Sequence, residues 1–293
     1  MKTLHRKRLG LAADPWASFH LDTADAARTA LMVEAAAKAR LFVSVLGARG
    51  SGKTHAVRRA FRRVPNARIV EPLRLRRECL HIGDIECAIV RELAPNERPR
   101  RSGEARSHQV RRLLGQAARE GPTVLLIDDA HVLHHATLRA LKRLRELAWL
   151  GVSPLLGIVL VGQADRAEAV AEVGLRSDRL LLGGLLPEEA AAALERALNR
   201  RGGRKTVFPD AIVALAASPR ARNWLDLAAL VDDCLAEAAA RGEDRITRAA
   251  ALSVLHPDRR PAPDIESPAS ADDEAVADIL AGLNGGERRE AVA

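Results

Sequence analysis

Residues 47–54 read Gly-Ala-Arg-Gly-Ser-Gly-Lys-Thr, which is a complete G-x-x-x-x-G-K-[ST] pattern. An apolar, β-branched stretch precedes it at residues 41–46, and a helical pattern follows at residues 55–63 and is closed by Pro65. A strand, a glycine-rich loop and a helix in this order bind phosphate, because backbone N–H groups and the helix N-terminus face the anion. We therefore predict that a nucleoside triphosphate binds to Gly47, Ala48, Arg49, Gly50, Ser51, Gly52, Lys53 and Thr54.

Two side chains of this phosphate loop have further predicted roles. Lys53 would reach the β- and γ-phosphates, and the hydroxyl of Thr54 would hold Mg²⁺. The alternative is a glycine-rich turn that happens to precede a lysine, and the strand and helix on either side argue against it.

A pair of acids supplies the second half of the predicted site. The apolar run at residues 123–127 ends in Asp128 and Asp129. An acid at the carboxyl end of a buried strand suits Mg²⁺ coordination, so Asp128 is the second candidate metal ligand. Asp129 is placed to activate the attacking water. Because Asp is one methylene shorter than the more usual Glu, we expect slow hydrolysis, or a residue that only polarises a water.

The apolar run at residues 157–161 leads into Gly162-Gln163. A polar side chain at the end of this strand can hydrogen-bond the attacking water or the γ-phosphate, so Gln163 is a further candidate. A glutamine that only caps the turn is the alternative interpretation, and the sequence leaves both open.

Strand-like and helix-like segments alternate over the first two-thirds of the chain. The predicted strands cover residues 41–46, 67–70, 123–127, 157–161 and 180–182. The predicted helices cover residues 55–63, 82–93, 108–120 and 136–150, with a long loop at 95–107. This alternation, with continuous apolar strands, predicts an α/β domain with a parallel sheet over residues 1–182.

Helical patterns alone follow from Pro187, and we predict a small all-helical domain over residues 183–256, with helices at 187 onward, 209–217, 223–241 and 247–255. Residues 257–293 are rich in Pro, Ala, Ser and Asp, which predicts a disordered acidic tail. Within this tail, residues 273–283 place apolar side chains at helical spacing. This segment is either a short docking helix or solvated chain with weak helicity.

The charge is unevenly distributed. The 293 residues carry a formal net charge of +8, and residues 257–293, with four Arg and nine Asp or Glu, contribute −5. Residues 1–256 therefore carry +13, which favours a polyanionic partner such as nucleic acid. The alternative is a compositional bias, because an Ala- and Arg-rich chain can also come from a GC-rich genome.

Composition also argues against a membrane or secreted protein. The longest apolar run, residues 155–161, is too short to span a bilayer, and the basic residues 1–8 have no apolar stretch of a secretory signal behind them. Cys79, Cys87 and Cys234 lack metal-ligand spacing and are interpreted as core residues of a protein in the reducing cytoplasm.

Several segments of residues 8–255 resemble the AAA+ ATPases, and in particular the subgroup of the secretion ATPase ExeA and the transposition ATPases of MuB and TniB type. The similar segments are Leu9 to Trp16, Val124 to Leu133 ("VLLIDDAHVL"), Ile158 to Gln163 ("IVLVGQ") and Ser218 to Asn223. The resemblance implies an AAA+ fold, with a P-loop NTPase sheet followed by a helical lid, and ATP as the nucleotide.

The resemblance also implies roles for three side chains. Gln163 would be sensor 1, and Arg220 would be sensor 2 near the γ-phosphate. The glycine and isoleucine of the family pattern are missing around Arg220, which leaves Arg222 as a rival. Arg179 aligns with the arginine that completes the site of a neighbouring subunit; an ordinary surface arginine is the alternative.

Three functions follow as hypotheses. The first is an ATPase that forms homo-oligomers on duplex DNA and delivers or activates a transposase. The second is a secretion or envelope-assembly ATPase like ExeA, which loses weight because no membrane segment is visible. The third is a regulatory switch that acts on a protein partner through the acidic tail. For the first, phosphate contacts are predicted from two arginine groups, which are Arg74, Arg76 and Arg77, and Arg98, Arg100, Arg101, Arg106, Arg111 and Arg112.

Overall fold

The structure is a computed structural model that describes residues 6, 14–16, 19–72, 80–164, 173–200 and 206–257. The chain divides into two units, Met1–Val254 and Leu255–Ala293. The elements described here lie in the first unit, apart from the last residue of the final helix. The predicted tail segment 273–283 lies outside the described residues. No helix in the described part of the chain has the length and apolarity that crossing a membrane requires.

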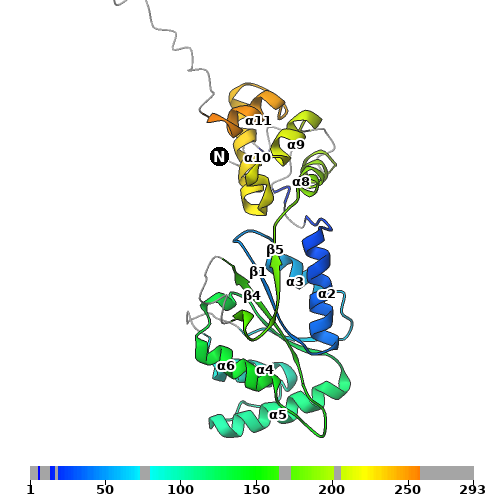
Figure 1. Ribbon diagram of the computed structural model, residues 1–293, viewed down its shortest axis with the longest axis vertical. Helices are drawn as coiled ribbons and strands as arrows, with labels where there is room; N and C mark the ends of the chain where they lie inside the picture. The colour runs from blue at the N-terminus through cyan, green and yellow to red at the C-terminus, as the bar shows by residue number, and fades with distance from the viewer. Residues whose placement is uncertain are drawn as a thin grey trace, which may run out of the picture. The chain divides into compact units, whose positions relative to one another are not determined.

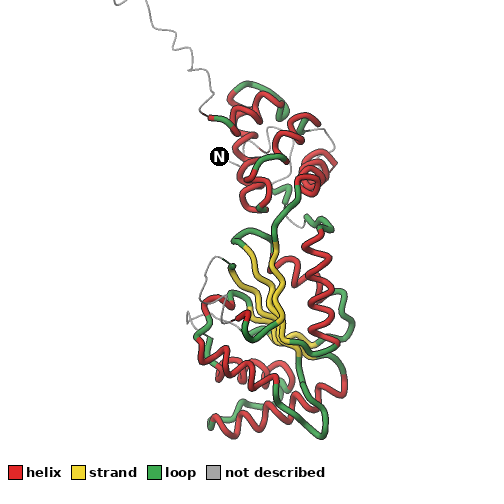
Figure 2. The backbone as a smooth tube through the Cα atoms, viewed as in Figure 1, coloured by secondary structure: helices red, strands yellow, loops and turns green. Residues whose placement is uncertain are grey.

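A five-stranded parallel sheet forms the centre of the α/β region (Figures 1 and 2). Its strands are β1 (Phe42–Gly47), β2 (Arg68–Val70), β3 (Thr123–Ile127), β4 (Gly157–Gln163) and β5 (Asp178–Leu182), in the order β2-β3-β4-β1-β5. Every residue of β1 and β3 is buried, as is β4 up to its last residue. The continuous apolar runs of the sequence therefore correspond to strands covered on both faces, and the predicted parallel α/β fold is confirmed.

Helices cover both faces of the sheet (Figure 1). On one face, α2 (Ala24–Lys38) and α3 (Lys53–Phe61) pack against the side chains of Val43 and Val45. On the other face, α4 (Ile82–Leu93), α5 (Gly103–Glu120) and α6 (His135–Arg145) enclose a second core with Phe42. Neighbouring residues of β1 thus point into different cores, as the two-residue period of a strand requires.

Helix α2 had no counterpart among the predicted elements. Its sequence, ADAARTALMVEAAAK, has seven alanines among its 15 residues, so the large apolar residues that mark a helical face are few. The small residues allow close packing instead. A Cβ atom on Gly157 of β4 would lie 2.0 Å from the carbonyl oxygen of Ala36, so glycine at position 157 permits this approach.

Two predicted helix boundaries were wrong. Helix α5 begins at Gly103 rather than His108, because Arg106 and Ser107 hydrogen-bond to Glu86 of α4 and so belong to the helical interface, not to a loop. Helix α6 ends at Arg145 rather than Leu150. There Leu150 (φ 46°) and Gly151 (φ 81°) form a tight turn that a helix cannot contain.

The helical region follows the sheet. It contains α8 (Pro187–Leu194), which continues as a π-helical segment (Glu195–Arg200), α9 (Pro209–Ala216), the 3₁₀ turn η3 (Pro219–Arg222), α10 (Trp224–Ala240) and α11 (Arg248–Leu255). These bounds agree with the predicted helices to within one residue where an end was predicted. The division into domains at residues 182 and 256 stays a prediction.

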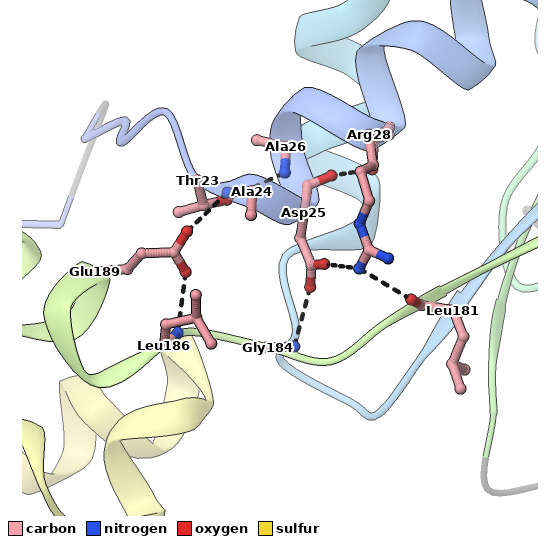
Figure 3. A network of polar contacts seen from close by, with 10 residues as sticks. Thr23, Ala24, Asp25, Ala26, Arg28, Leu181, Gly184, Leu186 and Glu189 are labelled. Atoms are coloured by element: carbon pink, nitrogen blue, oxygen red, sulfur yellow. Dashed lines mark hydrogen bonds and ion pairs between the residues drawn. The ribbon is translucent and has the colours of Figure 1, made fainter.

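Figure 3 shows how the N-terminus of α2 is joined to the segment between β5 and α8. The Asp25 carboxylate accepts a hydrogen bond from the Gly184 N–H (3.0 Å), and the Glu189 carboxylate accepts from the N–H groups of Ala24 (2.7 Å) and Leu186 (2.9 Å). Two carboxylates therefore fix the start of the helical region to α2. We call this set of contacts the hinge clamp.

Candidate functional site

The phosphate loop connects β1 to α3, as the sequence predicts. Gly50 (φ 83°) and Gly52 (φ 86°) adopt the left-handed conformation that favours glycine, and Gly52 is the N-cap of α3. The Ser51 N–H donates to the carbonyl of Ala48 (3.2 Å), which closes the loop on itself. The N-terminus of α3 therefore opens directly at this loop, in the geometry of an anion site.

Lys53 lies inside the curve of the loop. Its side chain is 8% exposed, and its ammonium donates to the carbonyl oxygens of Gly47 (3.0 Å) and Ala48 (2.7 Å). The positive charge is thus held where a phosphate group would sit over the loop, and the loop's own carbonyls satisfy it.

Thr54 and Asp128 meet although they are 74 positions apart in the sequence. The Thr54 hydroxyl donates to one oxygen of the Asp128 carboxylate (2.9 Å), and the Asp129 N–H donates to the other (2.9 Å). A hydroxyl and a carboxylate are the hard oxygen ligands that Mg²⁺ prefers. Magnesium keeps several waters and phosphate ligands, so two protein oxygens fit it without a larger acidic cluster.

Asp129 and Gln163 both lie at the carboxyl ends of the strands. Asp129 is exposed and adopts a left-handed conformation (φ 51°), which is uncommon outside glycine and occurs often at functional sites. Gln163 ends β4 in register with Gly47, the first residue of the loop. Its N–H donates to the Nδ1 atom of His131 (3.4 Å), a residue to which the sequence assigned no role.

The three arginines named from the resemblance have different surroundings. Arg179 is exposed on β5, a strand at the edge of the sheet, in register with Ser44 of β1. The Arg220 guanidinium forms an ion pair with Asp233 of α10 (2.8 Å). Arg222 has an exposed side chain, and its carbonyl accepts from the Leu185 N–H (2.8 Å). Their roles at a γ-phosphate stay predictions.

A pocket of about 640 Å³ adjoins the loop at Ser51 and Gly52. Its walls come mainly from residues 14, 16 and 19–30, from α3 and from the start of α10, three stretches of the sequence of which the last lies far from the others. Its volume lies in the range of small-molecule sites. The structure thus places a ligand-sized space next to the candidate phosphate site, which the sequence did not reveal.

Aromatic rings form one side of this pocket. Trp16 packs edge-on against Phe19 (centroids 5.7 Å apart) and Trp224 (6.4 Å), and Trp224 also contacts Phe19 (6.1 Å). The chain has only three Trp and four Phe, and three of these seven residues meet here. Only the fold brings them together, because Trp224 lies far from Trp16 and Phe19 in the sequence. The indole N–H of Trp16 is buried and has no hydrogen-bond partner in the described part of the chain.

Two histidines also line the pocket. The rings of His20 and His55 lie 5.4 Å apart. Burial lowers the pKa of His55, and the nearby charges of His20, Arg59 and Arg62 lower it further. A neutral His55 is thereby favoured near neutral pH.

The predicted DNA-contact arginines divide into two kinds. Arg106 is paired with Glu86 (2.9 Å), Arg112 with Glu97 (2.6 Å), and Arg111 donates to the Ala148 carbonyl (2.7 Å). The other three are exposed on the loop before α5, and we call them the loop arginines: Arg98, Arg100 and Arg101. Arg74, Arg76 and Arg77 lie outside the described residues.

Gln109 fixes the backbone that carries the loop arginines. It is 7% exposed; its side-chain oxygen accepts from the Arg100 N–H (3.1 Å), and its amide donates to the Arg98 carbonyl (3.2 Å) and to Glu97 (3.0 Å). The hydrogen bond from Gln109 and the adjacent Arg112 lower the pKa of Glu97. The loop arginines are therefore presented on an anchored backbone.

Comparisons with known proteins support an AAA+ fold. Residues 36–170 match the family model of the AAA domain. The chain is similar in structure to Drosophila ORC bound to DNA (16% identity, TM-score 0.57, covering 94% of this chain and 68% of that one). It is also similar to the ORC2 protein of Aeropyrum pernix in ADPNP-ADP complexes (15%, 0.53, 81% and 68%) and to Cdc6p from Pyrobaculum aerophilum (17%, 0.52, 85% and 71%). No curated protein matches the sequence.

At these identities the likeness to solved structures shows the fold alone. The fold is that of a P-loop AAA+ protein, as the sequence predicted, with the phosphate loop between β1 and α3. The assignment to the ExeA, MuB and TniB subgroup stays a prediction.

Proposed function

We propose that this protein binds ATP with Mg²⁺, hydrolyses it slowly, and binds duplex DNA as an ATP-dependent oligomer. The observation that carries this proposal is the convergence of three groups at one edge of the sheet. These groups are the Lys53 ammonium within the loop, the Thr54–Asp128 pair and the aromatic pocket beside Gly52.

The nucleotide fits this arrangement part by part. Its phosphates would lie over the loop, where Lys53 exchanges the carbonyls of Gly47 and Ala48 for phosphate oxygens. Thr54 and Asp128 would hold Mg²⁺, which neutralises charge on the phosphates. The base would enter the pocket beside Trp16 and Trp224, whose aromatic rings can pack against the flat base.

Hydrolysis would depend on residues at the strand ends. Asp129 accepts a proton from the water that attacks the γ-phosphorus, the bond to the β-phosphate oxygen breaks, and ADP and phosphate are formed. Gln163 would orient the water or the γ-phosphate. The short Asp129 side chain and the pairing of Arg220 with Asp233 both favour a low basal rate. Arg179 of a neighbouring subunit would then raise this rate on assembly.

Duplex DNA is the proposed macromolecular partner because the loop arginines are exposed, adjacent and anchored by Gln109. Arginine contacts to phosphate give binding that is salt-dependent and largely independent of sequence. The similar Drosophila ORC was solved bound to DNA, which supports the same class of partner here. A role in choosing transposition targets or activating a transposase rests on the resemblance to MuB and TniB. The alternative is a nucleotide switch or ExeA-like ATPase that acts on a protein partner through residues 257–293.

One experiment separates these parts. ATP binding is measured for the wild type, for Lys53→Ala and for Lys142→Ala, whose lysine is exposed on α6. Duplex DNA binding is then measured with ATP, with ADP and without nucleotide. We expect Lys53→Ala alone to abolish ATP binding and ATP-dependent DNA binding. Near-normal ATP affinity in Lys53→Ala would overturn the nucleotide site, and absence of DNA binding in every condition would leave only the protein-partner alternative.

A further inference from the structure

The N-terminus of α10 contacts the phosphate loop through the loop's carbonyl groups. The Asn223 side-chain amide donates to the carbonyl of Arg49, and the Trp224 N–H donates to the carbonyl of Gly50 (3.1 Å). Asn223 is also the N-cap of α10, since its side-chain oxygen accepts from the N–H groups of Leu225 (2.9 Å) and Asp226 (3.4 Å). Because one end of the Asn223 side-chain amide faces two N–H donors and the other faces a carbonyl, its oxygen and nitrogen can be assigned from their partners.

These two hydrogen bonds restrict the direction of two peptide groups. In a trans peptide, the C=O of one residue and the N–H of the next point in opposite directions. The Arg49 carbonyl shares its peptide with the Gly50 N–H, and the Gly50 carbonyl shares its peptide with the Ser51 N–H. Holding both carbonyls toward α10 therefore turns both N–H groups away from α10. The Ser51 N–H does point into the loop, toward the Ala48 carbonyl.

The packing at this contact is tight. A Cβ atom on Gly50 would lie 2.1 Å from the Asn223 side-chain oxygen, and one on Gly52 would lie 3.1 Å from the Trp224 ring. The glycines of the phosphate loop therefore serve two purposes. They allow the left-handed backbone, and they admit the start of α10.

The position of Asn223 is fixed from a second side. The preceding residue, Arg222, accepts from the Leu185 N–H (2.8 Å), and the neighbouring Gly184 N–H donates to Asp25 in the hinge clamp (Figure 3). A Cβ atom on Gly184 would lie 2.3 Å from the Arg222 carbonyl oxygen. The start of α10 is thus held between the hinge and the phosphate loop.

We propose that Asn223 is a positioning residue for triphosphate binding. Through the carbonyl of Arg49 it orients the loop peptides whose N–H groups receive the phosphates, and it acts without touching the nucleotide. The inference rests on the proposed function, because it assigns Asn223 to that same site. It also couples the loop to the helical region, since α10 must stay in place for the loop to keep its binding geometry.

The test uses Asn223→Ser, because serine caps a helix about as well as asparagine and adds no charge, but is too short to reach the Arg49 carbonyl. Thr247→Ala is the matched control: Thr247 accepts from the Ala250 N–H (3.1 Å) at the start of α11, so this variant loses a cap away from the loop. Loss of one neutral hydrogen bond predicts binding of ATP and ADP weaker by about 2- to 10-fold in Asn223→Ser. We expect no change in Thr247→Ala.

Hydrogen exchange of the peptide covering residues 47–54, measured without nucleotide, supplies a readout that does not depend on ATP binding. We expect faster exchange in Asn223→Ser and wild-type exchange in Thr247→Ala. Wild-type affinity and wild-type exchange in Asn223→Ser would overturn the inference and leave the nucleotide site intact. ATP binding that survives Lys53→Ala would instead overturn the proposed function, and with it the assignment of Asn223.

Discussion

Gly50→Ala tests the contact between the phosphate loop and α10 most directly. The substitution introduces two separate defects. Alanine must adopt the left-handed conformation at φ 83°, and its Cβ would lie 2.1 Å from the Asn223 side-chain oxygen, whereas ordinary contacts begin at 3.4 Å. Because the Gly50 backbone is held by its own hydrogen bond to Trp224, Asn223 has to move.

The expected loss in the free energy of unfolding follows from these two defects. The left-handed conformation costs alanine about 1–2 kcal/mol. Displacing Asn223 removes the hydrogen bond to Arg49 and weakens the cap of α10, each worth about 1 kcal/mol. We therefore expect the free energy of unfolding to fall by about 3–4 kcal/mol, together with weaker ATP binding.

Two other glycines provide matched controls. Gly242 has φ 73°, and among the described residues no atom beyond its chain neighbours lies within 4 Å of a Cβ there, so Gly242→Ala carries the backbone cost alone. Gly103 has no positive φ, and no atom in the described part of the chain lies close to a Cβ there, so Gly103→Ala carries neither cost. Urea denaturation followed by circular dichroism should rank the loss of stability as Gly50, then Gly242, then Gly103. If Gly50→Ala costs no more than Gly242→Ala, the contact between the loop and α10 is refuted.

Four further predictions concern the site and the core. Thr54→Val should remove most of the gain in ATP affinity that Mg²⁺ provides over EDTA, and an unchanged gain would exclude Thr54 as a ligand. Asp129→Asn should bind ATP but hydrolyse it at least about 100-fold more slowly, and undiminished turnover would show that Asp129 is not the base. If each loop arginine contacts a phosphate, changing all of them to Gln should reduce by about 3 the slope of log K for DNA binding against log salt concentration. An unchanged slope would show that DNA binds to another surface. Burial raises the pKa of Cys234 to about 12, so alkylation at pH 8 should label Cys234 only after unfolding, and rapid labelling of the folded protein would contradict its burial.

Local sequence patterns predicted the parts of the site that are local in the chain. The phosphate loop and the acids after β3 each follow directly from a buried strand, so apolar runs located both. Their meeting is also predictable, because parallel strands bring their carboxyl ends to one edge of the sheet. The Thr54–Asp128 distance of 2.9 Å is the result.

Features that depend on contacts between distant segments were not predicted. The aromatic pocket joins Trp16 to Trp224, and no periodicity links positions so far apart. The partner of Arg220 is Asp233, which only the packing of η3 against α10 reveals. Helix α2 was missed for a different reason: its buried face is made of Ala and Thr residues as well as Val33, and small side chains give little hydrophobic periodicity.

The composition of the pocket walls has a kinetic consequence. Residues near position 16 and position 224 can form one wall only after the chain has closed a loop of roughly 200 residues. A nucleotide bound there, as proposed, would stabilise the native state and add little to earlier, partly formed states. We therefore expect ATP to slow unfolding while leaving the refolding rate almost unchanged. Resistance to proteases that cut the transiently opened chain should then rise with the concentration of nucleotide.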